Sequence, residues 1–466
     1  MDGLALLLSR LQFAFTISFH VIFPSFTIGL AAWLTVLEAL HVITGRPLYR
    51  QLFQFWLRIF ALAFGIGVVT GIVMAFQFGT NWSTLSRVSG PIQGPLLSYE
   101  TFTAFYLEAS FFGILLLGRS RVAPWLYLVS TAMVALGTML SSFWILANNS
   151  WMQAPSGYAL HDGVFVPTSW TRILFSPVLW VRFPHMLLAS LMAGAFSVAA
   201  TGAWYSLRGR FGPEARLMLR MGLYSGALLV PIQLIFGHLT GDYVHDVQPA
   251  KFAAIEARWH DEQPAGEVLI ALPEEKAETN RFELKVPVLG SMIGSLSLHS
   301  KELGLTDFSR ADRPPVAIPF FSFRIMVGCG LILLLIAWAG AFQAHKGRLE
   351  AQRSLLWLTF LSFPLPFLAI LSGWFTAEVG RQPWVIYGVL RTAQAVTPSL
   401  TDRSAFLSLV VFGLLYTLIF CFGVLFTYRL LRTGPVEALV DPATPGESRR
   451  PLAVIHDAEL GVSSRK

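Results

Sequence analysis

The chain alternates between long apolar runs and short polar connections. Nine of the runs hold about 20 or more residues with few charges, the length that an α-helix needs to cross the hydrocarbon core of a bilayer. We therefore expect an all-α, polytopic membrane protein with about nine transmembrane helices. The predicted spans cover residues 12–40, 53–80, 95–117, 124–147, 177–205, 217–240, 319–344, 354–374 and 405–431.

Two polar segments interrupt this pattern. Residues 241–318 separate the sixth span from the seventh, and their Glu-rich middle, Asp261 to Lys285, predicts a solvated loop outside the membrane. Residues 433–466 combine Pro, Glu, Ser and Arg with little to bury, so we expect a disordered tail. The chain thus divides into six helices within 1–240, the loop, three helices within 319–432, and the tail.

Composition supports the membrane assignment. Hydrophobic residues make up 54% of the 466 positions and charged residues only 13%, against roughly a quarter charged in soluble proteins. The formal charge of +7 comes from arginines in short connections, so it indicates orientation in the membrane rather than binding of nucleic acid. The two cysteines, Cys329 and Cys421, lie inside apolar runs and provide neither a disulfide framework nor a thiolate metal site.

The basic residues also predict which side each connection faces. With 241–318 left out, thirteen Lys and Arg residues lie at one set of span ends and six at the other. Cytoplasmic connections carry the excess of Lys and Arg. We therefore expect the N-terminus and the 241–318 loop to face outward and the C-terminus to be cytoplasmic. The first span has no basic region before it and no convincing cleavage site, which favours its retention.

Several chemically active side chains are predicted within about 12 Å of the outer surface, at a rise of 1.5 Å per residue. An ionisable group inside a span is costly and marks a candidate functional site. Glu108, two turns deeper than Glu100, points toward the membrane interior. The group at the shared depth comprises His20, Glu100, His185, Met326 and Glu378.

The two histidines and the methionine are candidate haem ligands. A lone buried His is more often a hydrogen-bonded structural residue, and a lone Met is more often core packing. Two imidazoles at matching depth without a competing thiolate favour haem, and a His185–Met326 pair would give a six-coordinate, electron-transferring iron. Arg182 and Arg324, each close to one of these residues in sequence, could neutralise haem propionates, or could reach toward the interface as ordinary snorkelling side chains.

Glu100 and Glu108 lie on one predicted span. They are either neutral carboxylic acids hydrogen-bonded in a polar seam or members of a proton relay, because a buried site that consumes protons needs titratable groups to supply them. Either carboxylate could also lie against an iron.

Two further stretches carry polar groups at the outer face. Residues 373–384 place Glu378 and Arg381 between Trp374 and Trp384, which is either an interfacial cap with a local ion pair or a functional site. Residues 248–259 predict a short amphipathic helix. Its Lys251 and Glu256 either form a surface pair or bind and deprotonate the headgroup of a lipid-borne quinol.

Together these residues resemble subunit I of cytochrome bd-type quinol oxidases over nearly the whole chain up to about residue 431. The most specific motifs are Gly380-Arg381-Gln382-Pro383-Trp384, Gln248-Pro249-Ala250-Lys251 with Glu256, Arg324-Ile325-Met326, and His20 followed by Pro24. The resemblance implies nine transmembrane helices, mostly in two four-helix bundles plus one peripheral helix. It also implies an outward quinol-binding loop of the short class. Membership of the cyanide-insensitive branch is left open.

The resemblance assigns roles to individual residues. It implies His185 and Met326 as ligands of a low-spin haem b, and His20 and Glu378 as ligands of a high-spin haem b and a haem d, or a further haem b in its place, in an order left open. It implies Lys251 and Glu256 as the quinol pair. The other implied roles are catalytic or proton-transferring for Glu100, Glu108, Trp374 and Arg381, and cofactor-binding for Arg182, Arg324, Gln382 and Trp384.

The implied activity is oxidation of ubiquinol or menaquinol at the outer face of the bacterial cytoplasmic (inner) membrane. Dioxygen is reduced to water with protons from the cytoplasm and without copper. The implied partners are a second large subunit (subunit II), membrane lipid and, as an open option, small single-helix subunits. Haem–copper oxidases and di-haem cytochromes b need more intramembrane histidines than this chain has. The remaining alternative is a secondary transporter that uses Glu100, Glu108 and Arg324.

Overall fold

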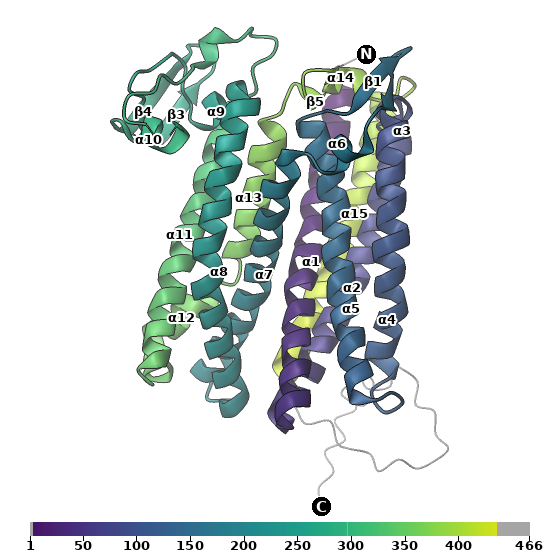
Figure 1. Ribbon diagram of the computed structural model, residues 1–466, viewed down its shortest axis with the longest axis vertical. Helices are drawn as coiled ribbons and strands as arrows, with labels where there is room; N and C mark the ends of the chain where they lie inside the picture. Colours follow the sequence, from purple (N-terminus) through teal and green to yellow (C-terminus); the bar gives the residue numbers. More distant parts are fainter. Residues whose placement is uncertain (1–2, 296, 436–466) are drawn as a thin grey trace, which may run out of the picture.

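The computed structural model describes residues 3–295 and 297–435, and nine helices within this part are long and apolar enough to cross a membrane. They lie side by side as a tall bundle with small hairpins and a separate lobe at one end (Figure 1). This confirms the predicted helical membrane fold. The residues from 436 onward, where most of the predicted disordered tail falls, lie outside the described part. The nine helical spans are Gly3–Thr44, Pro47–Thr80, Ser83–Leu117, Pro124–Gln153, Trp170–Leu207, Gly212–Val247, Ala317–His345, Arg353–Val379 and Asp402–Thr433.

Several helices begin well before the apolar runs that predicted them. Helix α1 (Gly3–Thr44) and α3 (Ser83–Tyr99) start earlier than the expected residues 12 and 95. His20 and Glu100 therefore lie further along their helices than His185 does in α7 (Pro177–Leu207) or Met326 in α11 (Ala317–His345). Counting residues from the start of each helix therefore does not place these four side chains at one common depth, as the sequence analysis expected.

Two spans are interrupted. The third consists of α3, a π-helical segment η1 (Glu100–Phe105) and α4 (Tyr106–Leu117). The eighth is divided into α12 (Arg353–Leu361) and α13 (Leu365–Val379). Pro364 immediately precedes α13, where a proline's missing N–H and fixed φ suit the start of a helix better than its interior. A π-helical turn often occurs at a functional position, and here it carries Glu100.

The spans pack in two groups. One contains α1, α2 (Pro47–Thr80), the α3–α4 span and α5 (Pro124–Gln153); the other contains α7, α8 (Gly212–Val247), α11 and the α12–α13 span. The last helix, α15 (Asp402–Thr433), lies against α1 and α2. The groups meet where α1 contacts α7. There Gly29 and Gly194 allow close approach, since a Cβ on Gly29 would lie 2.4 Å from the Ser190 carbonyl oxygen.

Three antiparallel hairpins outside the spans were not predicted from the sequence. They pair β1 (Tyr158–His161) with β2 (Val164–Pro167), β3 (Glu267–Glu274) with β4 (Thr279–Val286), and β5 (Trp384–Ile386) with β6 (Leu390–Arg391). Short helices α6 (Trp170–Leu174) and α14 (Thr392–Ala395) lie beside them at the same end of the molecule (Figure 1).

The long loop forms a lobe with its own apolar core. Helix α9 (Pro249–Ile255), the hairpin β3–β4 and α10 (Leu289–Ser295) lie beyond the ends of α8 and α11 (Figure 1). Trp259, Val268 and Leu305 bury their side chains together with Phe320 of α11. The lobe is therefore packed onto the second helix group.

Candidate functional site

His20 projects from α1 toward α2. Its Nδ1 lies 3.0 Å from the Thr70 hydroxyl, which itself donates to the Ile66 carbonyl at 2.8 Å. Because that hydroxyl proton is already used, Thr70 accepts from Nδ1–H, which leaves the Nε2 lone pair of His20 available as a ligand. A Cβ on Gly71 would lie 3.0 Å from the imidazole Cε1, so the glycine provides room for the ring.

His185 projects from α7 toward α8. Its Nε2 lies 3.4 Å from the Gln233 amide nitrogen, and a Cβ on Gly237 would lie 3.4 Å from its Cε1. The Nδ1 atom is buried and has no hydrogen-bond partner within residues 3–295 and 297–435. The imidazole thus makes one long contact with the described polypeptide and keeps an unsatisfied polar atom, which is unusual for a purely structural histidine. Nearby, Arg182 donates to the Ser150 hydroxyl of α5 at 3.3 Å.

Met326 contacts the helix that carries Glu378. A Cβ on Gly373 of α13 would lie 3.0 Å from the Met326 sulfur, so only a glycine leaves the thioether its present position. His185 and Met326 therefore both lie within the second helix group, one beside α8 and the other beside α13.

Glu378 lies at the end of α13 within a set of amide and guanidinium donors. Its Oε1 accepts from Asn149 at 3.0 Å and from Gln153 at 3.2 Å, both on α5, and its Oε2 forms an ion pair with Arg381. Arg381 is 5% exposed, and its Nε and Nη1 are buried with no partner among the described residues. The predicted ion pair is present; its arginine is buried and its glutamate is half-buried.

The two tryptophans of this stretch have different environments. Trp374 packs against Val21 of α1 and Ala193 of α7 on one side and against Leu146 and Ala147 of α5 on the other, so it lies where the two helix groups meet. Trp384 begins β5, and the Arg391 guanidinium lies 4.5 Å from its ring centroid. Between them, Gln382 accepts from the Thr392 hydroxyl at 2.8 Å, which fixes the hairpin to the end of α13.

Glu100 and Glu108 both face α5. Glu100 accepts from the Ser141 hydroxyl at 2.8 Å. Glu108 is 6% exposed, and a Cβ on Gly137 would lie 2.5 Å from its Cγ, so the glycine is needed for the carboxyl to pack there. The two carboxyls thus line the contact of η1 and α4 with α5 in the first helix group.

Lys251 and Gln248 attach the loop lobe to the end of α5. Lys251 Nζ donates to the Gln153 amide oxygen at 3.0 Å, and Gln248 donates to the Gln153 main-chain carbonyl at 2.6 Å. Lys251 is 4% exposed. Burial, followed by the charge of Arg182, holds the pKa of the Lys251 amine well below its ordinary value. Since Gln153 also bonds Glu378, two hydrogen bonds connect α9 with Glu378.

Arg324 is held by the loop lobe. Its Nη1 donates to the Ile255 carbonyl at 2.6 Å, and its Nη2 bonds Glu256 at 3.1 Å and Glu267 at 3.2 Å. Glu256 is as buried as Lys251, and no ion pair joins the two in the described part of the chain. The surface Lys251–Glu256 pair considered from the sequence is therefore wrong.

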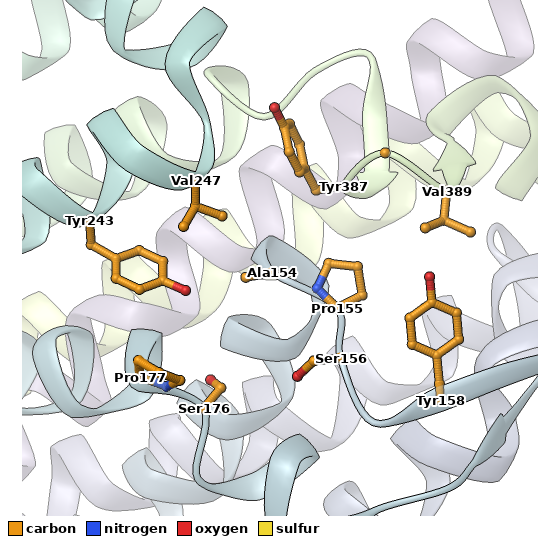
Figure 2. A pocket seen from close by; sticks show the side chains of 11 residues that line it. Ala154, Pro155, Ser156, Tyr158, Ser176, Pro177, Tyr243, Val247, Tyr387 and Val389 are labelled. Atoms are coloured by element: carbon orange, nitrogen blue, oxygen red, sulfur yellow. The ribbon is translucent and has the colours of Figure 1, made fainter.

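A hollow of about 460 Å³ opens beside the Gln153–Gln248 contact. Figure 2 shows Tyr243 and Val247 entering from α8, Tyr387 and Val389 from the β5–β6 hairpin, and Tyr158 near the residues that follow α5. Ser176 also lines this space, and its buried hydroxyl has no hydrogen-bond partner within the described ranges.

The sequence analysis missed several residues that position the site. Thr70, Asn149 and Gln153 are neutral, and no local pattern distinguishes them; Gly373 lies inside the stretch 373–384, but its contact with Met326 was not expected. Glu267 was counted only as part of a Glu-rich loop. The one feature of the sequence that could have pointed to Glu267 is its position directly before the apolar Val268–Ile270 run.

Known proteins resemble this chain over nearly its whole length. The chain is 34% identical to cytochrome bd-II ubiquinol oxidase subunit 1 of Escherichia coli (strain K12), over 92% of this chain and 96% of that one. It is also 34% identical to cytochrome bd ubiquinol oxidase subunit 1 of Bacillus subtilis (strain 168), over 92% and 93%. The solved bd oxidase from Geobacillus thermodenitrificans superposes with a TM-score of 0.87 at 28% identity, covering 93% of this chain and all of that one.

The family described as cytochrome bd terminal oxidase subunit I matches residues 8–435. This range includes every predicted ligand, the loop lobe and all nine helical spans except the first residues of α1. The chain therefore belongs to the cytochrome bd terminal oxidase subunit I family.

Proposed function

We propose that this haem-containing terminal oxidase subunit oxidises a membrane quinol at its outer face and reduces dioxygen to water at a pair of haems. Relatives named as ubiquinol oxidases support quinol as the substrate class. The observation that carries the proposal is the connection Lys251–Gln153–Glu378, which joins the loop helix to a candidate iron ligand through hydrogen bonds of 3.0 and 3.2 Å.

The donor groups fit haem. His20 offers Nε2, His185 is held only by a long 3.4 Å contact with Gln233, and the Met326 sulfur has a space that Gly373 keeps open. The unpartnered nitrogens of Arg381 suit an anionic propionate. We assign His185 and Met326 to a low-spin haem b, and His20 and Glu378 to a high-spin haem b and a haem d or further haem b. When bound, haem supplies one-electron transfer and an iron that binds dioxygen.

Protons for dioxygen reduction would come from the cytoplasmic side. Glu108 and Glu100 lie along the contact of α4 and η1 with α5, and the π-helical turn at Glu100 presents its carboxyl toward Ser141. Titratable groups inside a membrane span are the groups that can hold and pass protons there. We infer that Glu108 receives protons from the inner side and Glu100 delivers them toward the site, so that charge is separated without a pump and without copper.

Quinol would bind at the loop lobe. Lys251 at one end of α9 can bind a quinol oxygen, and Glu256 at the other end can accept a hydroxyl proton. Arg324 bonds Glu256 at 3.1 Å and holds it in position. Outward placement of this lobe and of the N-terminus follows from the excess of basic residues at the opposite ends of the helices.

The membrane setting includes partners. Exposed apolar side chains cover α15, including Leu407, Val411, Leu414 and Leu418, and a helical surface of this kind requires lipid or another apolar protein. We propose a second large oxidase subunit and bacterial inner-membrane lipid as those partners. Family membership disfavours the secondary transporter, which would need no haem.

A reduced-minus-oxidised spectrum of the purified complex tests the proposal. Pyridine haemochrome analysis would separate haem b from haem d, and ubiquinol- or menaquinol-dependent oxygen uptake would be measured on the same sample. We expect low-spin and high-spin haem bands together with quinol oxidase activity. A preparation that is folded but without haem bands, or that contains haem but does not oxidise quinol, would contradict the proposal.

A further inference from the structure

One guanidinium in the loop lobe serves two buried carboxylates. Arg324 Nη2 lies 3.1 Å from Glu256 Oε2 and 3.2 Å from Glu267 Oε1. Glu256 is 4% exposed and Glu267 is 8% exposed. The two acids come from different elements, the end of α9 and the start of β3, so the lobe has been folded to bring them together.

The charges around this pair do not balance if both acids are ionised. Two guanidiniums face three buried acids: Arg324 bonds Glu256 and Glu267, and Arg258, whose charge also acts on Glu267, lies 3.9 Å from the third acid, Glu302. Like charges held together in a buried site cannot both ionise readily, so one of the acids retains a proton. Burial and the neighbouring Glu256 accordingly raise the pKa of Glu267.

Glu256 of this pair borders a hollow in the loop lobe, and the residues on either side of Glu267, Gly266 and Val268, line it as well. This hollow has a volume of about 180 Å³ and is lined by Glu256 and Arg258. Its other titratable lining residues are His260, Glu262, Glu278, Glu283 and Lys285. All of these belong to the outward lobe, so a proton released into the hollow reaches the outer aqueous side.

We propose that Glu267 shares a proton with Glu256, and that this pair transfers the protons of the oxidised quinol into the hollow at the outer face. This inference rests on the proposed quinol oxidation. A quinol O–H bond breaks and a Glu256 O–H bond forms while an electron leaves for the haem groups of the oxidase. The pair then loses a proton to water in the hollow and returns to its singly protonated form. A second such cycle accounts for the two protons and two electrons of one quinol.

Glu267 acts through Glu256 and is therefore a positioning residue. A single carboxylate paired one-to-one with an arginine is a weak base, because the ion pair favours its charged form. A second acid on the same guanidinium provides a site that gains and loses protons closer to working pH, where general acid–base groups are most effective. The pair, rather than Glu256 alone, supplies that property.

The test uses the intact oxidase complex with Glu267→Gln, which keeps the side-chain shape but cannot titrate. We expect quinol oxidase kcat to fall by about tenfold or more. In the wild type, kcat should rise with pH through the higher of the two ionisations of the Glu256–Glu267 pair. We expect this rise to be absent in Glu267→Gln. Oxygen uptake with N,N,N′,N′-tetramethyl-p-phenylenediamine, an electron donor that needs no quinol deprotonation, should stay at the wild-type rate. Glu267→Asp should restore part of the kcat and the pH dependence.

Glu274→Gln is the matched control, since it makes the same change on the same strand at a surface ion pair with Arg281. It should behave as the wild type. The inference is overturned if Glu267→Gln keeps both the wild-type kcat and its pH profile, or if the rates with both donors fall together with the haem bands. Absence of quinol oxidation by the wild-type complex would instead overturn the proposed function.

Discussion

Lys251 of the loop helix donates to the side-chain oxygen of Gln153 at 3.0 Å, and this glutamine amide donates in turn to Glu378 at 3.2 Å. Gln153 is the last residue of α5 and is 4% exposed. One neutral side chain therefore joins the candidate quinol helix to a candidate iron ligand. A change at either end can affect the other through this amide.

Replacing Gln153 should affect both ends of the connection. Gln153→Ala leaves the buried Lys251 amine without its acceptor, which costs about 1–3 kcal/mol of stability, and we expect a lower Tm and a higher KM for quinol. Gln153→Glu keeps an acceptor for Lys251, so its KM for quinol should stay closer to the wild-type value than that of Gln153→Ala. It also places a second carboxylate beside Glu378, so it should perturb a high-spin haem band more than Gln153→Ala does. Equal behaviour of the two variants in thermal unfolding, kinetics and spectra would argue against the connection.

The Gly373–Met326 contact provides a test of the low-spin ligand. Gly373→Val would press on the Met326 sulfur, since even a Cβ would lie 3.0 Å from it. A methionine that only fills space moves aside easily, whereas a sulfur bound to iron cannot. We expect a shifted or lost low-spin haem band. Gly328→Val on α11 is the control, because nothing lies within 4 Å of its added Cβ. A wild-type spectrum for Gly373→Val would remove Met326 as a ligand.

Glu378→Ala should remove one high-spin haem signal and spare the low-spin one. A carboxylate is a weak-field ligand, which leaves iron high-spin, and Glu378 faces α5 rather than the Met326 contact. The low-spin band of the same sample serves as the internal control. Reduced-minus-oxidised spectra that do not differ from the wild type would contradict this assignment.

The fold was largely predictable because its main determinant is local. Runs of apolar residues require helices in a membrane wherever they occur, and Glu378 was expected at the end of the eighth span because it directly follows such a run. The hairpin β3–β4 was not predicted, since the Glu267–Glu274 segment contains the unbroken apolar run Val268–Leu272 instead of a clean alternation, and no Asn-Gly or Asp-Gly turn follows it.

The sequence pointed to candidate ligands and ionisable residues but not to the neutral side chains that hold them in place. Gln153 lies 225 positions from Glu378 along the chain, so only the tertiary structure joins them. Arg324 shows a second limit. Its position near Met326 was known from the sequence, but the direction of its side chain was not. The Arg324 side chain points to carbonyls and carboxylates of the loop lobe. These acceptors take up hydrogen bonds from a guanidinium group, which has five N–H donors.

The buried amine of Lys251 predicts a pH dependence of stability. Its folded-state pKa is lowered, chiefly by burial, so between that value and the ordinary pKa of about 10.4 the unfolded chain binds more protons. Stability from this group therefore rises with pH across that window and is lost as pH falls through the lowered pKa. We expect the Tm of the wild type, relative to Lys251→Met, to increase from neutral pH toward pH of about 10.

Substitutions of Lys251 also test whether this residue binds quinol or only supports the fold. Lys251→Ala and Lys251→Met should both raise the KM for quinol without altering haem content. Lys276→Met, at an exposed position of the β3–β4 turn, is the control and should change neither KM nor the pH dependence. Loss of haem in the Lys251 variants would show that the residue is structural, and a pH-independent Tm difference would show that its amine is not perturbed.

An ion pair with a buried carboxylate joins α1 to the connection between α4 and α5. Arg119 Nη1 lies 2.6 Å from Glu38 Oε1, the Glu38 side chain is fully buried, and the Arg119 guanidinium lies 4.6 Å from the Tyr127 ring centroid. Arg119→Ala would leave the Glu38 carboxylate without its counter-ion, and breaking a buried pair from one side costs about 3–5 kcal/mol. We expect a clearly lower Tm with the haem bands retained below the transition.

Replacing both partners should recover much of that loss, because Glu38→Gln with Arg119→Ala removes the uncompensated charge as well as the pair. Arg121→Ala, two residues away at an exposed position of the same turn, should leave the Tm close to the wild-type value. Thermal unfolding of the solubilised complex compares the four proteins directly. Equal Tm values for Arg119→Ala and Arg121→Ala would mean that water or lipid compensates Glu38, and that the pair does not hold α1 to the α4–α5 connection.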